Sequence, residues 1–181
     1  SATVIVDGDT MTEENIKKAG FKTLDPIAEL ELQDYNVVIP DITTMTKEAL
    51  KDSGMDNKAM VKCKNMFALG ICFWMYNRPD DFAKSFLDSK FAKKNPLVAE
   101  ANKKVIEAGY NYAANTHQFA NNYTVAPAKL EKGTYRSING NVATAWGFIA
   151  ASEKSGLPLF CGSYPITPAT VILEELAKHK N

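Results

Sequence analysis

The chain has 181 residues, 45% of them apolar, and its 21 Lys and Arg balance its 21 Asp and Glu. This length suits one ordinary domain or two small pieces of larger ones, and the apolar content excludes a disordered or fibrous chain. The balanced charge gives no support to binding of nucleic acid or of an anionic membrane. The charge is unevenly spread, because residues 1–60 carry 12 acidic side chains against 6 Lys, and residues 61–136 carry 12 basic side chains against 6 acidic ones.

Three cysteines, Cys63, Cys72 and Cys161, are widely spaced. Disulfide frameworks, zinc sites and iron–sulfur clusters need closely spaced cysteines, so we expect reduced thiols and no metal held by this chain. The longest apolar run, residues 66–76, is interrupted by Gly70 and is shorter than the roughly 20 residues that a bilayer requires. No signal peptide is visible. The sequence therefore predicts a cytoplasmic protein that neither spans a membrane nor binds nucleic acid.

The first third of the chain alternates between strand and helix patterns. In chain order we expect a buried strand over Thr3–Asp7, a helix that Thr10 and Glu13 cap as a capping box and that ends at Gly20, a strand over Asn36–Pro40, and a helix over 44–53 that ends at Gly54. This alternation is typical of the α/β fold class.

The middle of the chain reads as helical. We expect a helix that Asn57 caps and that runs to about Tyr76, a short amphipathic helix around residues 80–87, and a long helix that Asn95 caps and Pro96 opens. The long helix has one apolar face, formed by Leu97, Ala101, Val105, Ala108 and Tyr112. Their spacing of three and four residues predicts core packing rather than a ligand site.

The last third begins with a loss of periodicity. Residues 115–136 form a polar stretch punctuated by Asn115, Asn121, Asn122, Pro127 and Gly133, which predicts a linker and a domain boundary near 120–136. After it we expect a helix that Asn141 caps and that ends at Gly156, a short buried strand over Leu157–Cys161, a rigid turn over 162–168 and a helix over Ala169–Lys178.

The turn over 162–168 is the most specific candidate site. It follows a predicted strand and opens a helix, where open α/β sheets bind ligands. Two prolines fix the backbone on either side of Thr167, and the helix N-terminus offers free N–H groups to an anion. The Thr167 hydroxyl could therefore bind a carboxylate or phosphate, or it could cap the helix that begins at Pro168.

Other candidates are weaker. Asp7–Asp9 resembles part of an acidic metal loop but lacks the later ligands of a calcium site, and a solvated turn is the alternative. Lys62, Lys64 and Asn65 could hold phosphates or could lie on an exposed helix face. His117 has no evident Ser or Cys partner, which gives no support to a catalytic triad.

Several motifs carry a resemblance to a known family. The motifs Gly140–Gly147, Ser155–Phe160 and Gly162–Ala169 resemble the opening of the α subunit of 2-oxoacid:ferredoxin oxidoreductases, most closely of the 2-oxoglutarate type. Upstream, Thr3–Asp7, Cys63–Gly70, Ala99–Lys103 and Ala108–Tyr110 resemble the latter half of the γ subunit. In some members γ and α are fused in this order, and the resemblance covers nearly the whole chain.

The resemblance implies a division of the chain and an activity. Residues 1–120 would form the latter half of a γ-type three-layer α/β domain, 121–136 a linker, and 137–181 the start of a thiamine-diphosphate-binding, pyrimidine-type α/β domain. The enzyme would oxidatively decarboxylate a 2-oxoacid on thiamine diphosphate, pass electrons through iron–sulfur clusters to ferredoxin, and deliver the acyl group to coenzyme A.

The resemblance also implies roles for residues of the turn. Thr167 would orient the substrate carboxylate as the catalytic residue, and Tyr164, Pro165 and Ile166 would form the wall of the cofactor site. Thiamine diphosphate would be shared with a partner β subunit, which would hold the magnesium ion and the iron–sulfur cluster, so this chain alone is expected to bind no cofactor. The expected partners are the β subunit, ferredoxin, coenzyme A and the 2-oxoacid.

Two departures from the family pattern limit what this chain can do. The Gly-rich strand–turn–helix that opens the family's γ region does not precede Thr3, and a glutamate that activates thiamine lies beyond the position of Asn181 in the family. We therefore expect an internal fragment that is inactive by itself. The alternative is a non-catalytic α/β module that binds coenzyme A or assembles subunits.

Overall fold

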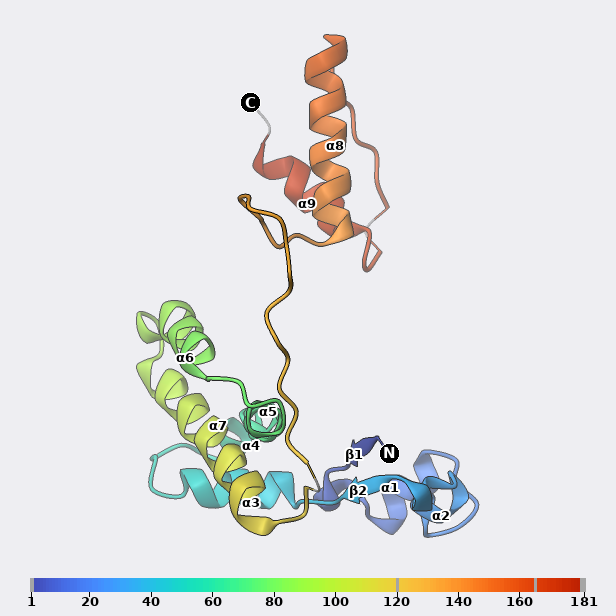
Figure 1. The fold of residues 1–181 in the computed structure, drawn as a ribbon, viewed down its shortest axis with the longest axis vertical. Coiled ribbons are helices and arrows are strands. Elements are labelled where there is room, and N and C mark those ends of the chain that lie inside the picture. Colours follow the sequence, from blue (N-terminus) through green and yellow to red (C-terminus); the bar gives the residue numbers. More distant parts are fainter. Residues whose placement is uncertain (1, 120, 165, 180–181) are drawn as a thin grey trace. The chain divides into compact units, whose positions relative to one another are not determined.

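The computed structural model describes residues 2–119, 121–164 and 166–179. The chain divides into two compact units, Ser1–Pro127 and Ala128–Asn181 (Figure 1). The strands and α-helices of the first unit are β1 (Thr3–Ile5), α1 (Glu13–Lys18), α2 (Pro26–Glu29), β2 (Asn36–Val38), α3 (Ile42–Leu50), α4 (Asn57–Val61), α5 (Lys64–Met75), α6 (Asp81–Leu87) and α7 (Pro96–Thr116). The second unit contains α8 (Gly140–Ser155) and α9 (Thr170–Lys178).

The two strands of the first unit lie side by side and run parallel (Figure 1). Thr3 lies opposite Asn36, and Ile5 lies opposite Val38. The crossover between them carries α1 and α2, which is how parallel neighbours must be joined. The α/β class is therefore confirmed, whereas the γ-type three-layer arrangement stays a prediction. β1 is half-buried rather than buried, since among the described residues it pairs with β2 alone.

The core of the first unit lies where α5 and α7 pack together, with α3 alongside. Its buried side chains include Leu50, Phe67, Ile71, Val105 and Ala113. The predicted apolar face of α7 is confirmed at Ala101 and Val105, which are buried. Leu97, at the exposed beginning of α7, does not join the core.

The long helix begins as the sequence predicts. The Asn95 side chain accepts the N–H of Val98 at 3.3 Å, and Pro96 occupies the first turn of α7, where its missing N–H costs nothing. The short helix near residue 80 is also present as α6, and Asn77, at φ 46°, lies in the break before it.

Three predicted helix caps are wrong by one or two residues. Thr12, Asp56 and Asn139 cap α1, α4 and α8 in place of Thr10, Asn57 and Asn141. The Thr10 hydroxyl is engaged elsewhere, because it donates to the Asp7 carbonyl at 2.7 Å. In each case two residues able to cap lie close together, and the one directly before the first helical residue makes the cap. The helix predicted over 57–76 is interrupted at Lys62–Cys63 and forms α4 and α5.

The described residues between α7 and α8 form neither helix nor strand, as expected for a linker. The buried strand predicted over Leu157–Cys161 is wrong. No described residue pairs with this segment, and a strand needs a hydrogen-bonded neighbour; Leu157 and Phe160 are 68% and 91% exposed. No helix in the described part of the chain is long and apolar enough to cross a bilayer.

Candidate functional site

The turn that the sequence singles out lies in the second unit, just before α9. Tyr164 and Ile166 are 78% and 57% exposed, and Thr167 is exposed as well. Pro165, the fourth predicted member of this site, lies outside the described residues. The turn therefore presents an aromatic side chain, an aliphatic side chain and a hydroxyl to the surroundings.

The backbone of the turn is held mainly by local hydrogen bonds. The Ile166 N–H donates to the Tyr164 carbonyl at 2.8 Å, and the Thr170 N–H donates to the Ile166 carbonyl at 3.1 Å. The Thr167–Pro168 peptide bond is cis. The Pro168 carbonyl accepts the N–H of Val171 at 3.3 Å, and it also accepts the side-chain amide of Asn141 at 3.0 Å.

The structure shows that Thr167 does not cap α9. α9 begins at Thr170, its N-cap residue is Ala169, and no described side chain caps it. The interpretation of Thr167 as the cap of a helix beginning at Pro168 is therefore wrong, because the intervening turn moves the helix start two residues along the chain. The hydroxyl of Thr167 is not used in that way and is exposed.

A buried carboxylate, that of Glu175, joins α8 to α9. Glu175 is 8% exposed and accepts the Trp146 indole N–H at 3.0 Å and the Lys178 ammonium at 2.7 Å. The hydrogen bond from Lys178 and the one from Trp146 lower the pKa of Glu175 to about 2, so the group is ionised at neutral pH. Local sequence patterns do not predict the Trp146–Glu175 pair, since the two residues are 29 positions apart.

A cavity of about 470 Å³ lies between α8, α9 and the segment before the turn. Its lining is mostly apolar, with one thiol and one imidazole: Ile149, Leu159, Cys161, Leu173, Leu176, Ala177 and His179. Cys161 directly precedes the turn, so this cavity and the predicted site residues share one short stretch of chain.

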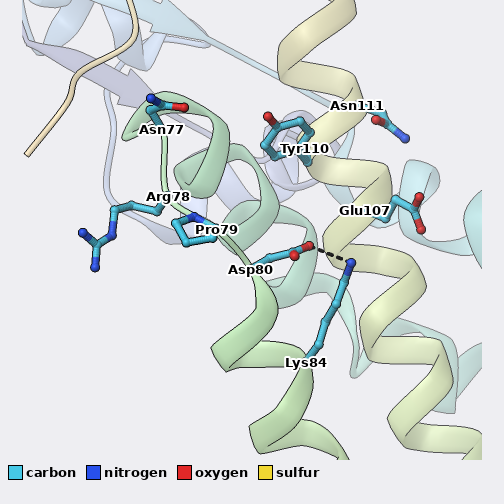
Figure 2. A pocket seen from close by; sticks show the side chains of 8 residues that line it. All are labelled: Asn77, Arg78, Pro79, Asp80, Lys84, Glu107, Tyr110 and Asn111. Carbon is cyan, nitrogen blue, oxygen red and sulfur yellow. Dashed lines mark ion pairs between the residues drawn. The ribbon is translucent and has the colours of Figure 1, made fainter.

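The first unit contains a polar pocket of about 540 Å³ where α6 begins against α7 (Figure 2). Figure 2 shows the side chains of Asp80 and Lys84 directed toward each other, and their charged atoms lie 2.9 Å apart. The hydrogen bond that Lys84 donates to the Asp80 carboxylate raises the pKa of Lys84. Because these two charges neutralise each other, the pocket offers hydrogen-bonding groups rather than a strong field for one sign of ligand.

The acidic turn at Asp7–Asp9 is neither a metal loop nor a freely solvated turn. The Asp7 carboxylate accepts the Ile42 N–H at 3.1 Å and the Lys64 ammonium at 3.2 Å. The Asp9 carboxylate accepts the Thr44 N–H at 2.7 Å. Both acids therefore satisfy free N–H groups at the N-terminus of α3 from a different element. The Lys64 ammonium is paired with Asp7. Lys62 and Asn65 are exposed.

The cysteines and acidic residues offer little to a metal ion. Burial raises the pKa of the Cys63 and Cys72 thiols, which disfavours the thiolate that binds metals. Within the described ranges, no three or more His, Cys, Asp or Glu side chains gather closely enough to hold a metal ion.

A known protein is similar to this chain over nearly the whole length of the chain. Over 178 residues, 98% of this chain, the sequence is 46% identical to the 2-oxoglutarate oxidoreductase subunit KorA of Mycobacterium tuberculosis. The chain spans 27% of the length of that relative. No protein-family model and no solved structure matches the chain. The similarity confirms the resemblance stated from the motifs, and the share of the relative that is covered agrees with a piece of a longer subunit.

Proposed function

We propose, from its similarity to a 2-oxoglutarate oxidoreductase subunit, that this chain is part of an enzyme that oxidatively decarboxylates 2-oxoglutarate. Electrons would pass to ferredoxin, and the succinyl group would pass to coenzyme A. The observation that carries the proposal is the 46% identity across nearly all of the chain. The identity extends over both units, so it supports a shared role for the whole stretch rather than for one motif.

The turn before α9 would supply the groups that meet the substrate. In this proposal Thr167 donates its hydroxyl hydrogen to the carboxylate of the 2-oxoacid, and Tyr164, Pro165 and Ile166 form a wall of the cofactor site. Support comes from the hydroxyl of Thr167, which is exposed and does not cap α9. Thiamine diphosphate, when bound, supplies the stabilisation of the carbanion that decarboxylation produces.

The residues present fit one wall of such a site. The turn offers an aromatic ring, an aliphatic side chain and a hydroxyl, which suit the contact with a heteroaromatic ring and a carboxylate. We propose that a partner β subunit supplies the ligands of magnesium and of the iron–sulfur cluster. We also propose a cytoplasmic location, from the three free thiols, Cys63, Cys72 and Cys161.

The test uses the full-length subunit purified together with its β subunit. Reduction of a viologen dye should require 2-oxoglutarate, thiamine diphosphate and coenzyme A together, and a polypeptide of residues 1–181 alone should show no reduction. Titration with thiamine diphosphate should give a saturable signal for the complex. Binding of the β subunit without thiamine diphosphate binding or turnover would instead favour the assembly-module alternative and contradict the proposal.

A further inference from the structure

The amide side chain of Asn141 links two segments that are distant in the sequence. Its Nδ2 atom donates to the carbonyl oxygen of Pro168 at 3.0 Å, across 27 residues of chain. Asn141 lies in the first turn of α8, and Pro168 lies just before α9. Because Pro168 directly follows Thr167, the bond fixes the backbone at the residue next to the hydroxyl.

The cap of α8 does not depend on Asn141. That role belongs to Asn139, whose side chain accepts the Val142 N–H at 2.9 Å. The amide of Asn141 is therefore free for a contact outside its own helix. The chain thus has two asparagines two residues apart, of which one stabilises the helix end and the other holds the turn.

The other hydrogen bonds of the turn do not tie it to α8. Ile166 and Thr170 bond within four residues of themselves, and so does the second donor to Pro168, the Val171 N–H. The side chains of Tyr164 and Ile166 are exposed and give little packing to hold it. Among the described residues, the bond from Asn141 is the hydrogen bond that joins the turn to α8.

We propose that Asn141 is a positioning residue, which holds the Thr167–Pro168 backbone against α8 so that the Thr167 hydroxyl meets the substrate carboxylate. This inference rests on the function proposed above. An error of about 1 Å in the position of a binding group can cost roughly 100-fold in rate, so one hydrogen bond can matter to the reaction without contacting the substrate.

The test compares four variants of the full-length subunit assembled with its β subunit. Asn141→Asp keeps the shape of the side chain and removes the donor, and the new negative charge suits the N-terminus of α8, so the helix is not weakened. Asn141→Ala removes the side chain. Asn139→Ala is the matched control, since it removes the cap of the same helix. Thr167→Val removes the hydroxyl that the turn is proposed to present.

The readouts are kcat and KM for 2-oxoglutarate, the melting temperature, and amide hydrogen exchange of residues 162–168 without substrate. For Asn141→Asp we expect faster exchange in this segment and a roughly 10-fold loss of kcat/KM, carried by KM, at an unchanged melting temperature. Asn141→Ala should show the same kinetic loss. Asn139→Ala should lower the melting temperature and leave kcat/KM unchanged.

Two results would overturn the inference, and they are distinguishable. If Thr167→Val loses activity while Asn141→Asp keeps both normal exchange and normal kinetics, Asn141 does not position the turn, and the proposed function stands. If exchange rises in Asn141→Asp but neither variant changes kcat/KM, the bond holds the turn without serving the reaction. In that case the proposed role of Thr167 fails together with the positioning role.

Discussion

Gly70 of α5 lies against the backbone of Ile106 of α7. A Cβ atom on Gly70 would overlap the carbonyl oxygen of Ile106 and lie 2.8 Å from the Tyr110 nitrogen. Gly109 of α7 faces Phe67 in the same way, and its Cβ would lie 2.8 Å from the Phe67 carbonyl carbon. The two helices therefore approach until their backbones touch, which only glycine allows at these two positions.

This contact predicts that Gly70→Ala and Gly109→Ala destabilise the first unit. The obstructing atoms belong to the backbone and cannot rotate away, so each substitution should lower the free energy of unfolding by about 1–3 kcal/mol. Gly147→Ala is the matched control, because Gly147 is inside α8 and has nothing within 4 Å of its Cβ position. That change should stabilise its helix by about 0.5–1 kcal/mol. Denaturant unfolding measures all three, and equal effects at Gly70 and Gly147 would contradict the close approach.

Removing the side-chain hydroxyl of Thr46, in α3, should stabilise the folded protein. It is fully buried, and its hydroxyl has no hydrogen-bond partner among the described residues. Thr46→Val keeps the shape and removes the unpaired group, so the free energy of unfolding should rise by about 1 kcal/mol. Thr43→Val in the same helix is the control, because the Thr43 hydroxyl donates to Asp7 at 3.2 Å. Thermal melts should move in opposite directions, and a loss of stability in Thr46→Val would show that its hydroxyl is paired.

The stability of the second unit should depend on pH through the ionisation of Glu175. Its pKa is about 2 in the folded chain and 4.5 for the unperturbed group. Because folding lowers the pKa, the carboxylate contributes stability that is complete above about pH 4.5 and is lost as the pH falls toward 2. Thermal unfolding followed by Trp146 fluorescence should show this loss, and Glu175→Gln should remove most of it. The exposed neighbour variant Glu174→Gln should keep it; if all three proteins titrate alike, Glu175 is not the group responsible.

We expect a protease to cut the chain first in the segment between α7 and α8. Its described residues form no helix or strand, and Val125, Leu130 and Tyr135 are all exposed. Limited trypsin digestion should cut first at Lys129, Lys132 or Arg136, and mass spectrometry of the products identifies the bond. First cleavage at Lys62 or Lys64, between α4 and α5, would place the weakest point inside the first unit instead.

The local signals in the sequence were sufficient for some elements and not for others. Asn95 followed by Pro96 marks the start of α7 correctly, because cap and first turn depend on neighbouring residues alone. Asn139 and Asn141 could not be told apart, since both residues can cap a helix and the contact that Asn141 makes instead is with Pro168, 27 residues further along the chain. Gly70 reads as an interruption of an apolar run, and its close contact with α7 depends on a partner far along the chain.

For the candidate site, too, the sequence predicted the features that depend on neighbouring residues and not those that depend on distant ones. The proline pair around Thr167 correctly marks a turn before the last helix, and the motif carries the family resemblance. Neither the Trp146–Glu175 hydrogen bond between α8 and α9 nor the bond from Asn141 to the turn was predicted, because each joins residues that are far apart in the sequence. The strand predicted over Leu157–Cys161 failed because apolar composition alone cannot supply a neighbouring strand.

The most direct test of the central claim is the steady-state kinetics of Thr167→Val and Thr167→Ser in the assembled full-length enzyme with 2-oxoglutarate. If Thr167 binds the substrate carboxylate, Thr167→Val loses a hydrogen bond to a charged group worth about 1.5–3 kcal/mol, roughly a 10- to 150-fold fall in kcat/KM. Thr167→Ser, which retains the hydroxyl, should stay close to the parent enzyme. An unchanged kcat/KM in Thr167→Val, with thiamine diphosphate bound normally, would contradict the account.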